Sequence, residues 1–240
     1  MITNLLRSTV RYQSVRRPLR RGALATAWPG GVSRLVGRRP LRGLVMAGLL
    51  CLPGLAAADA EADFQRGLEA YQVRGDVVTA MQAFQSAAEQ GHAQAQVRLA
   101  YILDAAGADA EAVSWLRRAA EQDDAEGQFM LARMVSEGEG TERDTEQALE
   151  LYRAAAENGY TQALVVIAEA QERGVLGLER DPEAALALWR RAAEVGEQEA
   201  LHRLQRAHQR GELGLAPDPA MAAQWRERIE AARRAAEAKQ

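Results

Sequence analysis

The chain has 240 residues and a formal net charge of −3, but the charge is unevenly distributed. Residues 1–58 contain ten arginines and no Asp, Glu or Lys, so the rest holds all 33 acidic residues against 20 basic ones, a net charge of −13. A body this acidic repels phosphate backbones, which argues against a nucleic-acid partner. Its single cysteine, Cys51, excludes an intramolecular disulfide framework, so packing must stabilise the fold.

The N-terminal segment has the pattern of an export signal. The basic "GRRPLRG" at 37–43 precedes the apolar "LVMAGLLCLPGLAAADA" at 44–60, which has small residues at Ala56 and Ala58. This predicts residues 1–58 as a leader with a signal peptide cleaved near Ala58, and hence a periplasmic or secreted protein that is not inserted in the membrane. The apolar run is shorter than the ~20 residues of a membrane span. An uncleaved anchor and a mitochondrial-type presequence are the alternatives.

Residues 1–31 exceed what a signal peptide needs, and "RRPLR" occurs both at 16–20 and at 38–42. One interpretation places the true start codon downstream, near Val32, so that residues 1–31 are a mis-assigned start. The other makes them a disordered basic leader. The arginine pair in the second "RRPLR" leaves both general secretion and twin-arginine export open as the route.

A phrase of packing residues recurs through 59–240. It reads "AFQSAAEQGHAQA", "WLRRAAEQDDAEG", "LYRAAAENGYTQA" and "LWRRAAEVGEQEA", and a fifth copy is degenerate. The four clear copies follow one another at 32, 36 and 37 residues, a period typical of stacked helical units. An alanine and, four residues later, a large apolar residue share one helical face in each copy. The large residues are Phe84, Leu116, Tyr152, Trp189 and, in the fifth copy, Trp225.

Helix boundaries flank each phrase. Asp144, Asp181 and Asp218 stand where N-caps are expected, and a proline follows two of them. Three of the phrases are followed by a glycine, which commonly closes a helix in the left-handed conformation. Each unit therefore consists of a first helix and a second helix that carries the phrase. We expect first helices at 94–105, 126–137, 162–173 and 199–210.

The join between the two helices is short in units one and two and longer in units three to five, where it reads "GEGTERD", "GVLGLERD" and "GELGLAPD". Together with "W/Y-x-x-A-A-E-x-G-x-x-x-A", these long joins resemble the Sel-one-like repeat (SLR), a long-loop relative of the tetratricopeptide repeat. The resemblance covers about 62–232. The usual Leu-Gly pair departs from the pattern and is inverted as Gly67-Leu68 in unit one. Gln171 and His208 replace the usual Tyr in units four and five.

The resemblance implies an all-α fold for residues 59–240: a right-handed superhelical α-solenoid of about five helix-turn-helix repeats. The first helices are then expected to line its concave face. The last helix, at about 219–238, is long and charged, as suits a capping helix at the end of a solenoid.

Catalytic and metal-binding patterns are missing. The three histidines are His92, His202 and His208; the last two fall on different faces of one helix, and His92 is expected in a surface turn. There is no His-Glu-x-x-His, no Gly-x-Ser-x-Gly, and no Ser-x-x-Lys because Lys239 is the single lysine. We therefore expect no enzyme activity, no cofactor and no metal.

Binding is the function that the sequence favours. The resemblance implies a partner protein or peptide held in the concave groove, so we predict a non-catalytic protein-interaction scaffold or adaptor of the bacterial cell envelope. A peptidoglycan- or carbohydrate-binding module is an alternative, and a cell-wall-related hydrolase is a weaker one. The identity of the partner and the oligomeric state stay open. The predicted partner-binding residues are Glu69, Tyr101, Phe129, Arg133, Glu169, His202 and Arg206.

Overall fold

The structure is a computed structural model that describes residues 53–238, with side chains from Ala58 onward. The chain divides into two compact units, Met1–Leu50 and Cys51–Gln240, and the described residues all belong to the second. The predictions about the export signal and the start codon therefore lie outside the described residues, apart from the proposed cleavage point at Ala58.

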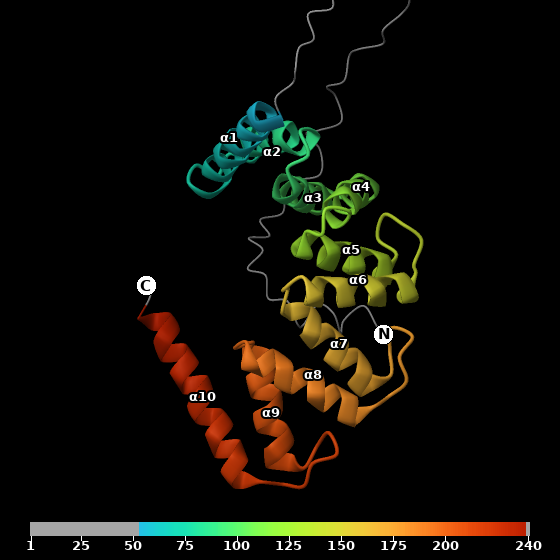
Figure 1. Ribbon diagram of the computed structural model, residues 1–240, viewed down its shortest axis with the longest axis vertical. Coiled ribbons are helices and arrows are strands. Elements are labelled where there is room, and N and C mark those ends of the chain that lie inside the picture. Colours follow the sequence, from blue (N-terminus) through green and yellow to red (C-terminus); the bar gives the residue numbers. More distant parts are fainter. Residues whose placement is uncertain (1–52, 239–240) are drawn as a thin grey trace, which may run out of the picture. The chain divides into compact units, whose positions relative to one another are not determined.

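Ten α-helices make up the described part, which contains no strand (Figure 1). The all-α prediction is confirmed, and the expected first helices match α3, α5, α7 and α9 to within one residue at each end. The helices are α1 (Pro53–Gln72), α2 (Val77–Glu89), α3 (Ala93–Ala106), α4 (Asp109–Ala120), α5 (Ala125–Glu137), α6 (Thr145–Glu157), α7 (Gln162–Arg173), α8 (Pro182–Glu194), α9 (Gln198–Arg210) and α10 (Pro219–Glu237).

The helices stack in chain order as five pairs. Each odd-numbered helix packs most extensively on the even-numbered helix that follows it, and that even helix packs on the next odd one. The buried apolar side chains form two clusters, one from Phe64 to Ile167 and one from Leu164 to Trp225, and the half-buried Ala156 and Leu188 pack against both. This is the predicted α-solenoid.

The repeated phrase forms this core. Its leading alanines Ala80, Ala112, Ala148 and Ala185 are fully buried, which lets the helices approach closely. The large residues that follow them, from Phe84 to Trp189, are at most 2% exposed. Burying one such side chain contributes about 2–3 kcal/mol. The phrase is thus a packing element, as its spacing predicted.

The predicted N-caps are present in the long-join units. Oδ1 of Asp144, Asp181 and Asp218 each accepts two hydrogen bonds from backbone N–H groups of the first helical turn, at 2.9–3.1 Å. The backbone N–H of each of these aspartates also donates to a carbonyl of the preceding odd helix, at 2.7–3.1 Å. Each long join is therefore a closed loop, pinned at its end to the helix from which it starts.

The inverted Gly67-Leu68 pair has a steric reason. A Cβ placed on Gly67 would lie 2.5 Å from the ring of Phe84, so α1 can lie this close to α2 only with a glycine there. Among the α1 side chains that the structure describes, Ala60 and Phe64 belong to the core, at 3% and 5% exposure. A chain that started at Asp59 would keep both of these core residues.

Candidate partner-binding surface

Five of the predicted residues occupy equivalent positions in successive odd helices. Glu69, Tyr101, Arg133, Glu169 and Arg206 each lie two residues beyond the core Leu, Ile or Gly of their helix, and none of the five is fully buried. We call the surface made by these residues and the side chains that contact them the first-helix face. They occupy one equivalent position on each odd helix, and we refer to this series of positions as the column.

The other two predicted residues do not belong to this column. Phe129 is 4% exposed and packs on Tyr152, with ring centroids 5.4 Å apart, and on Tyr160, at 4.6 Å. It is a core residue and offers no surface to a partner. The position two residues before the core leucine points inward in α5, because the odd helices are covered on more than one side. His202, at the equivalent position of α9, is exposed.

Where α3 meets α5, the first-helix face carries complementary groups. The carboxylate of Glu126 lies 3.2 Å from Nη1 of Arg98 and accepts a 3.0 Å hydrogen bond from the Tyr101 hydroxyl. The Arg98 guanidinium also lies 5.8 Å from the centre of the Tyr101 ring. All three groups are therefore satisfied within the fold.

Arg133 is held by acids from both sides of its helix. Its guanidinium lies 2.9 Å from Asp104 on α3, 2.9 Å from Glu139 in the following join, and 3.4 Å from Glu137 on α5 itself. Burial raises the pKa of Asp104 above its usual value, and the nearby Arg133 offsets this only in part. The cluster fixes α3, α5 and the unit-three join together.

At the equivalent positions of α7 and α9, both residues are acidic, whereas α3 and α5 have one tyrosine and one acid. Glu169 is the equivalent of Tyr101, and Glu199 is the equivalent of Glu126. Burial first and repulsion from Glu169 second raise the pKa of Glu199 to about 7, although the charges of Arg206 and Arg173 lower it in part. The pKa of Glu169 is raised as well, chiefly by burial. Glu169 lies 3.8 Å from Nη2 of Arg173, so arginines offset part of the repulsion that Glu169 exerts on Glu199.

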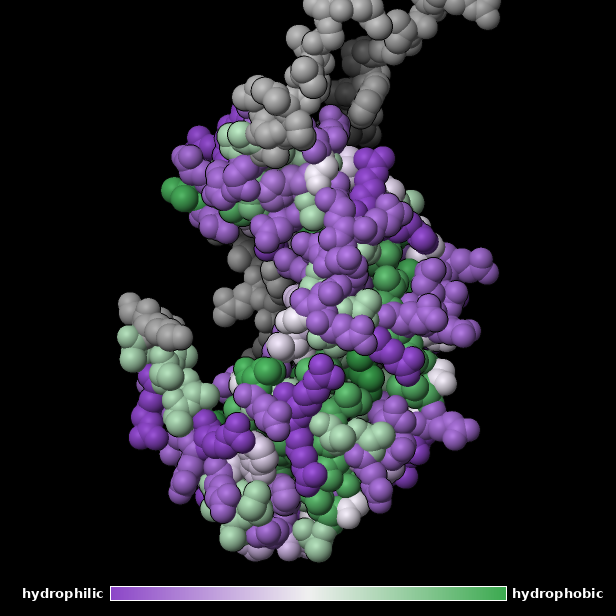
Figure 2. Space-filling model, in the orientation of Figure 1, coloured by the Kyte–Doolittle hydropathy of each residue, from purple (hydrophilic) through white to green (hydrophobic). Residues whose placement is uncertain are grey.

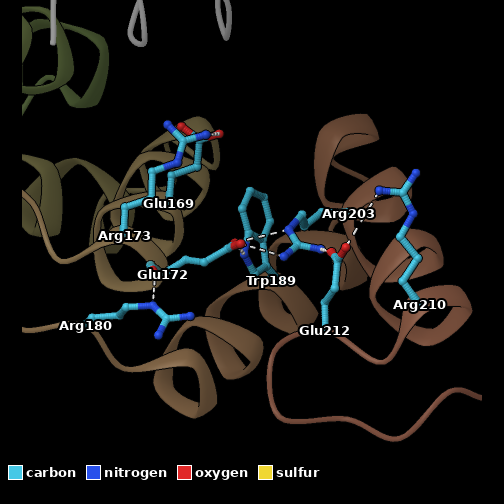
Figure 3. A network of polar contacts seen from close by, with 8 residues as sticks. All are labelled: Glu169, Glu172, Arg173, Arg180, Trp189, Arg203, Arg210 and Glu212. Carbon is cyan, nitrogen blue, oxygen red and sulfur yellow. Dashed lines mark hydrogen bonds and ion pairs between the residues drawn. The ribbon is translucent and has the colours of Figure 1, made fainter. Parts of the chain in front are cut away.

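A charged network joins α7, α8 and α9 beside this pair (Figure 3). Arg203 makes a bidentate contact with Glu172, at 2.5 and 3.1 Å, and also reaches Glu212 in the last join at 2.7 Å. The indole N–H of Trp189 donates to Glu172 at 3.3 Å. Burial alone would raise the pKa of Glu172, but the hydrogen bonds and charge of Arg203 outweigh it and lower the pKa. The Arg203 side chain is 11% exposed, so the network is largely internal.

Sequence reasoning missed the partners that set the charge of this surface. Glu126 and Glu199 each precede a predicted column residue by seven positions, which places them on the same helical stripe two turns away. That spacing could have identified both residues. Their pairing with Tyr101 and Glu169 could not be identified, because it depends on how neighbouring helices cross.

The described residues contain no group of three or more His, Cys, Asp or Glu side chains placed to hold a metal ion. No described helix is both long and apolar enough to cross a membrane.

His92 is more than a surface turn residue: its Nδ1 accepts from the backbone N–H of Ala95 and so caps α3, and its Nε2 lies 3.0 Å from Glu61 on α1. Its position is explained by structure alone.

Comparison with known proteins gives a consistent result. The Sel1 repeat family model matches five consecutive segments, residues 60–92, 93–124, 125–160, 161–197 and 198–228. Each matched segment covers one odd helix and the even helix that follows it, except that the first match begins within α1 and the last ends within α10, so the matches agree with the five helix pairs.

Three individual proteins show the same similarity. An uncharacterised protein of Neisseria meningitidis serogroup B is 36% identical over 85 residues, which are 35% of this chain and 18% of that protein. The crystal structure of a Sel1 repeat protein from Oxalobacter formigenes is 28% identical with a TM-score of 0.63, and covers 71% of this chain and 70% of its own. A protective antigen of uropathogenic Escherichia coli with an SLR fold is 27% identical with a TM-score of 0.64, over 71% of this chain and 38% of its own.

Proposed function

The chain belongs to the Sel1 repeat family, whose members are generally protein-interaction scaffolds, and we propose that it is a non-catalytic scaffold or adaptor of the bacterial cell envelope. In this proposal one segment of a partner protein binds along the first-helix face. The even helices supply the repeated core, and the odd helices present the residues that differ between units.

The observation that carries the proposal is the carboxylate pair of Glu169 and Glu199. The equivalent positions of α3 and α5 show that the fold can accommodate a neutral donor and an acid there, so the pair is not required by packing. Local departures from optimal stability concentrate at functional surfaces. A cationic side chain of a partner would relieve the repulsion, and Arg206 beside the pair would select its position.

The envelope assignment rests on the sequence pattern of residues 1–58. Supporting it, the core residues Ala60 and Phe64 of α1 both lie after Ala58, so removal of a signal peptide at that point would keep them. Fractionation of the producing cells and sequencing of the mature N-terminus test this part. The proposal expects an exported chain that begins at or next to Asp59; a chain that stays in the cytoplasm with residues 1–58 intact would contradict it.

Partner binding is tested by chemical crosslinking of the tagged full chain in its own cells, followed by mass spectrometry of the crosslinked proteins. We expect a specific protein whose recovery falls at least about tenfold with Glu169→Arg and with Arg206→Glu, since about 1.4 kcal/mol of lost affinity is tenfold. Arg226→Glu on α10 is the matched control, because Arg226 is also an exposed arginine without an ion pair among the described residues. It should leave recovery unchanged.

Two results would overturn the proposal. One is recovery of the same protein at the same level with both variants, which would remove the first-helix face as the binding surface. The other is retention of the purified chain on insoluble peptidoglycan in the absence of any protein, which would make it a peptidoglycan-binding module. Circular dichroism of each variant establishes that the fold is intact before recovery is compared.

A further inference from the structure

A second surface lies on the opposite side of α7. A groove of about 390 Å³ runs between α6 and α8, and α7 forms its floor. Both even helices pack on α7, but they share no extended contact with each other. Figure 2 shows apolar side chains at the surface in this region, between the positions that α6 and α8 occupy in Figure 1.

The floor consists of Leu164, Ile167 and Gln171, which follow one stripe of α7. Glu169 points to the other side of the helix, so the groove and the first-helix face are separate surfaces. The wall from α8 adds Leu188 and small alanine side chains, which keep the groove open.

Gln171 is the residue that distinguishes this unit. At the equivalent position, Leu103, Val135 and His208 are buried at 4%, 0% and 8% exposure, whereas Tyr71 on the terminal helix α1 is 51% exposed. Gln171 is half-buried instead, and its amide donates to the carbonyl of Glu179 in the unit-four join at 3.1 Å. The usual apolar side chain is thus absent from the end of the groove.

Two arginines stand on opposite walls. Arg153 belongs to α6 and Arg191 to α8, and neither has an ion-pair partner among the described residues. Glu157 is the single acid in the lining. At physiological ionic strength, charges more than about 8 Å away are largely screened, so these arginines outweigh the acidic character of the whole body. The apolar side chains that remain accessible are those of Leu188 and the neighbouring alanines, since Leu164 and Ile167 are only 4% and 6% exposed. Arginine beside accessible apolar side chains is typical of a protein interface.

We propose that this groove binds a short segment of a second partner protein, which places an apolar side chain against Leu188 and Ala187, above the buried Leu164 and Ile167, and carboxylates beside Arg153 and Arg191. Ligand pockets in proteins usually have volumes of about 300–1,000 Å³, and this groove is at the lower end of that range. It therefore suits one or two large side chains rather than a whole helix. Because the first-helix face lies across α7, the chain can hold both partners at once, as a scaffold does.

The test selects random short peptides, displayed on phage, on the immobilised full chain, and measures the affinity of each selected peptide by fluorescence anisotropy. Enriched peptides are expected to combine a large apolar residue with Asp or Glu. Ala187→Trp, which fills the groove from the exposed side of α8, and Arg153→Glu with Arg191→Glu should each lower the affinity at least about tenfold.

Arg190→Glu is the matched control, since Arg190 is exposed on the same helix without lining the groove, and the affinity should stay within about twofold.

Enriched peptides without acidic residues, or affinities that Ala187→Trp leaves unchanged, would overturn the proposal. So would peptides whose binding is lost with Arg206→Glu, which would place them on the first-helix face. Light scattering tests whether a second copy of this chain occupies the groove instead. A dimer that dissociates with Ala187→Trp would show this and would overturn the proposal. If Ala187→Trp fails to fold, the charge reversals alone decide.

Discussion

The first-helix face has two comparable regions, which we call edges: the first lies where α3 meets α5 and the second where α7 meets α9. The two edges have chemically different side chains at the same backbone positions. At the first edge Glu126 is paired with Arg98 and Tyr101. At the second, the charge of Glu169 contributes to the raised pKa of Glu199, and the neighbouring Arg203 belongs to an internal network with Glu172. The difference teaches that a repeat fold fixes where side chains stand, whereas their charges are free to vary. The second edge therefore combines the buried ion pair of Arg203 and Glu172 with a surface glutamate, Glu199, whose charged form is unfavourable.

The largest expected contrast concerns Arg203 and its positional equivalent Arg98. Arg203→Met should destabilise the chain by about 2–3 kcal/mol, because it leaves the partly buried Glu172 without its bidentate partner. Arg98→Met should lose at most about 1 kcal/mol, since that pair is more exposed. Urea unfolding of both full-length variants measures the contrast. Equal losses would mean that the two edges are tied equally.

The next contrast is between Glu199→Gln and Glu126→Gln. The folded pKa of Glu199, about 7, is higher than the ordinary value of 4.5 expected in the unfolded chain. Its protonated form therefore stabilises the fold below that ordinary value, and this stabilisation is lost as the pH rises through the folded pKa.

Glu199→Gln should consequently stabilise the chain by about 1–2 kcal/mol at about pH 8 and have little effect at about pH 4. Glu126→Gln should instead lose about 0.5–1 kcal/mol at the higher pH, because it removes the charge that Arg98 and Tyr101 satisfy. Thermal melts across this pH range decide the sign. A loss of stability with Glu199→Gln at high pH would contradict the strained-edge interpretation.

An exchange of residues sharpens the comparison further. Glu169→Tyr gives α7 the residue that α3 has at the same position, so the pKa of Glu199 should fall and stability at about pH 8 should rise by up to about 1 kcal/mol. Tyr101→Glu should have the opposite effect on the first edge. NMR titration of the glutamate side chains measures both. An unchanged Glu199 pKa in Glu169→Tyr would show that repulsion between the two acids plays no part.

The smallest expected effect concerns the turns that lead into the two edges. Asp123 stands at φ +58° before α5, where Gly196 stands at φ +91° before α9. Since only glycine adopts this region without strain, Asp123→Gly should stabilise the chain by about 0.5 kcal/mol. The gain is limited because Gln128 contacts the Asp123 carboxylate at 3.4 Å. A loss above that size in urea unfolding would show that this contact outweighs the strain.

Most of the fold could be predicted because, within each repeat, the spacing of nearby residues determines which side chains are buried. The spacing from Ala148 to Tyr152 defines a helical face, and Asp144 defines where that helix begins, so helix ends were predicted to within one residue. The site depended on relations between helices. Whether Phe129 faces the core and whether Glu199 faces Glu169 follow from crossing angles, which no period in the sequence encodes. The groove beside Gln171 could not be foreseen for the same reason.

The central claim is that the partner of the proposed scaffold binds on the first-helix face, which the odd helices present. The most direct measurement is a photo-crosslinking scan in cells, with a light-activated amino acid placed at Tyr101, Glu169 or Arg206 and, as controls, at the exposed Gln82 and Ser114 of α2 and α4. The account predicts one discrete crosslinked partner from the odd-helix positions and none from the two controls. Crosslinks from Gln82 and Ser114 alone would contradict it.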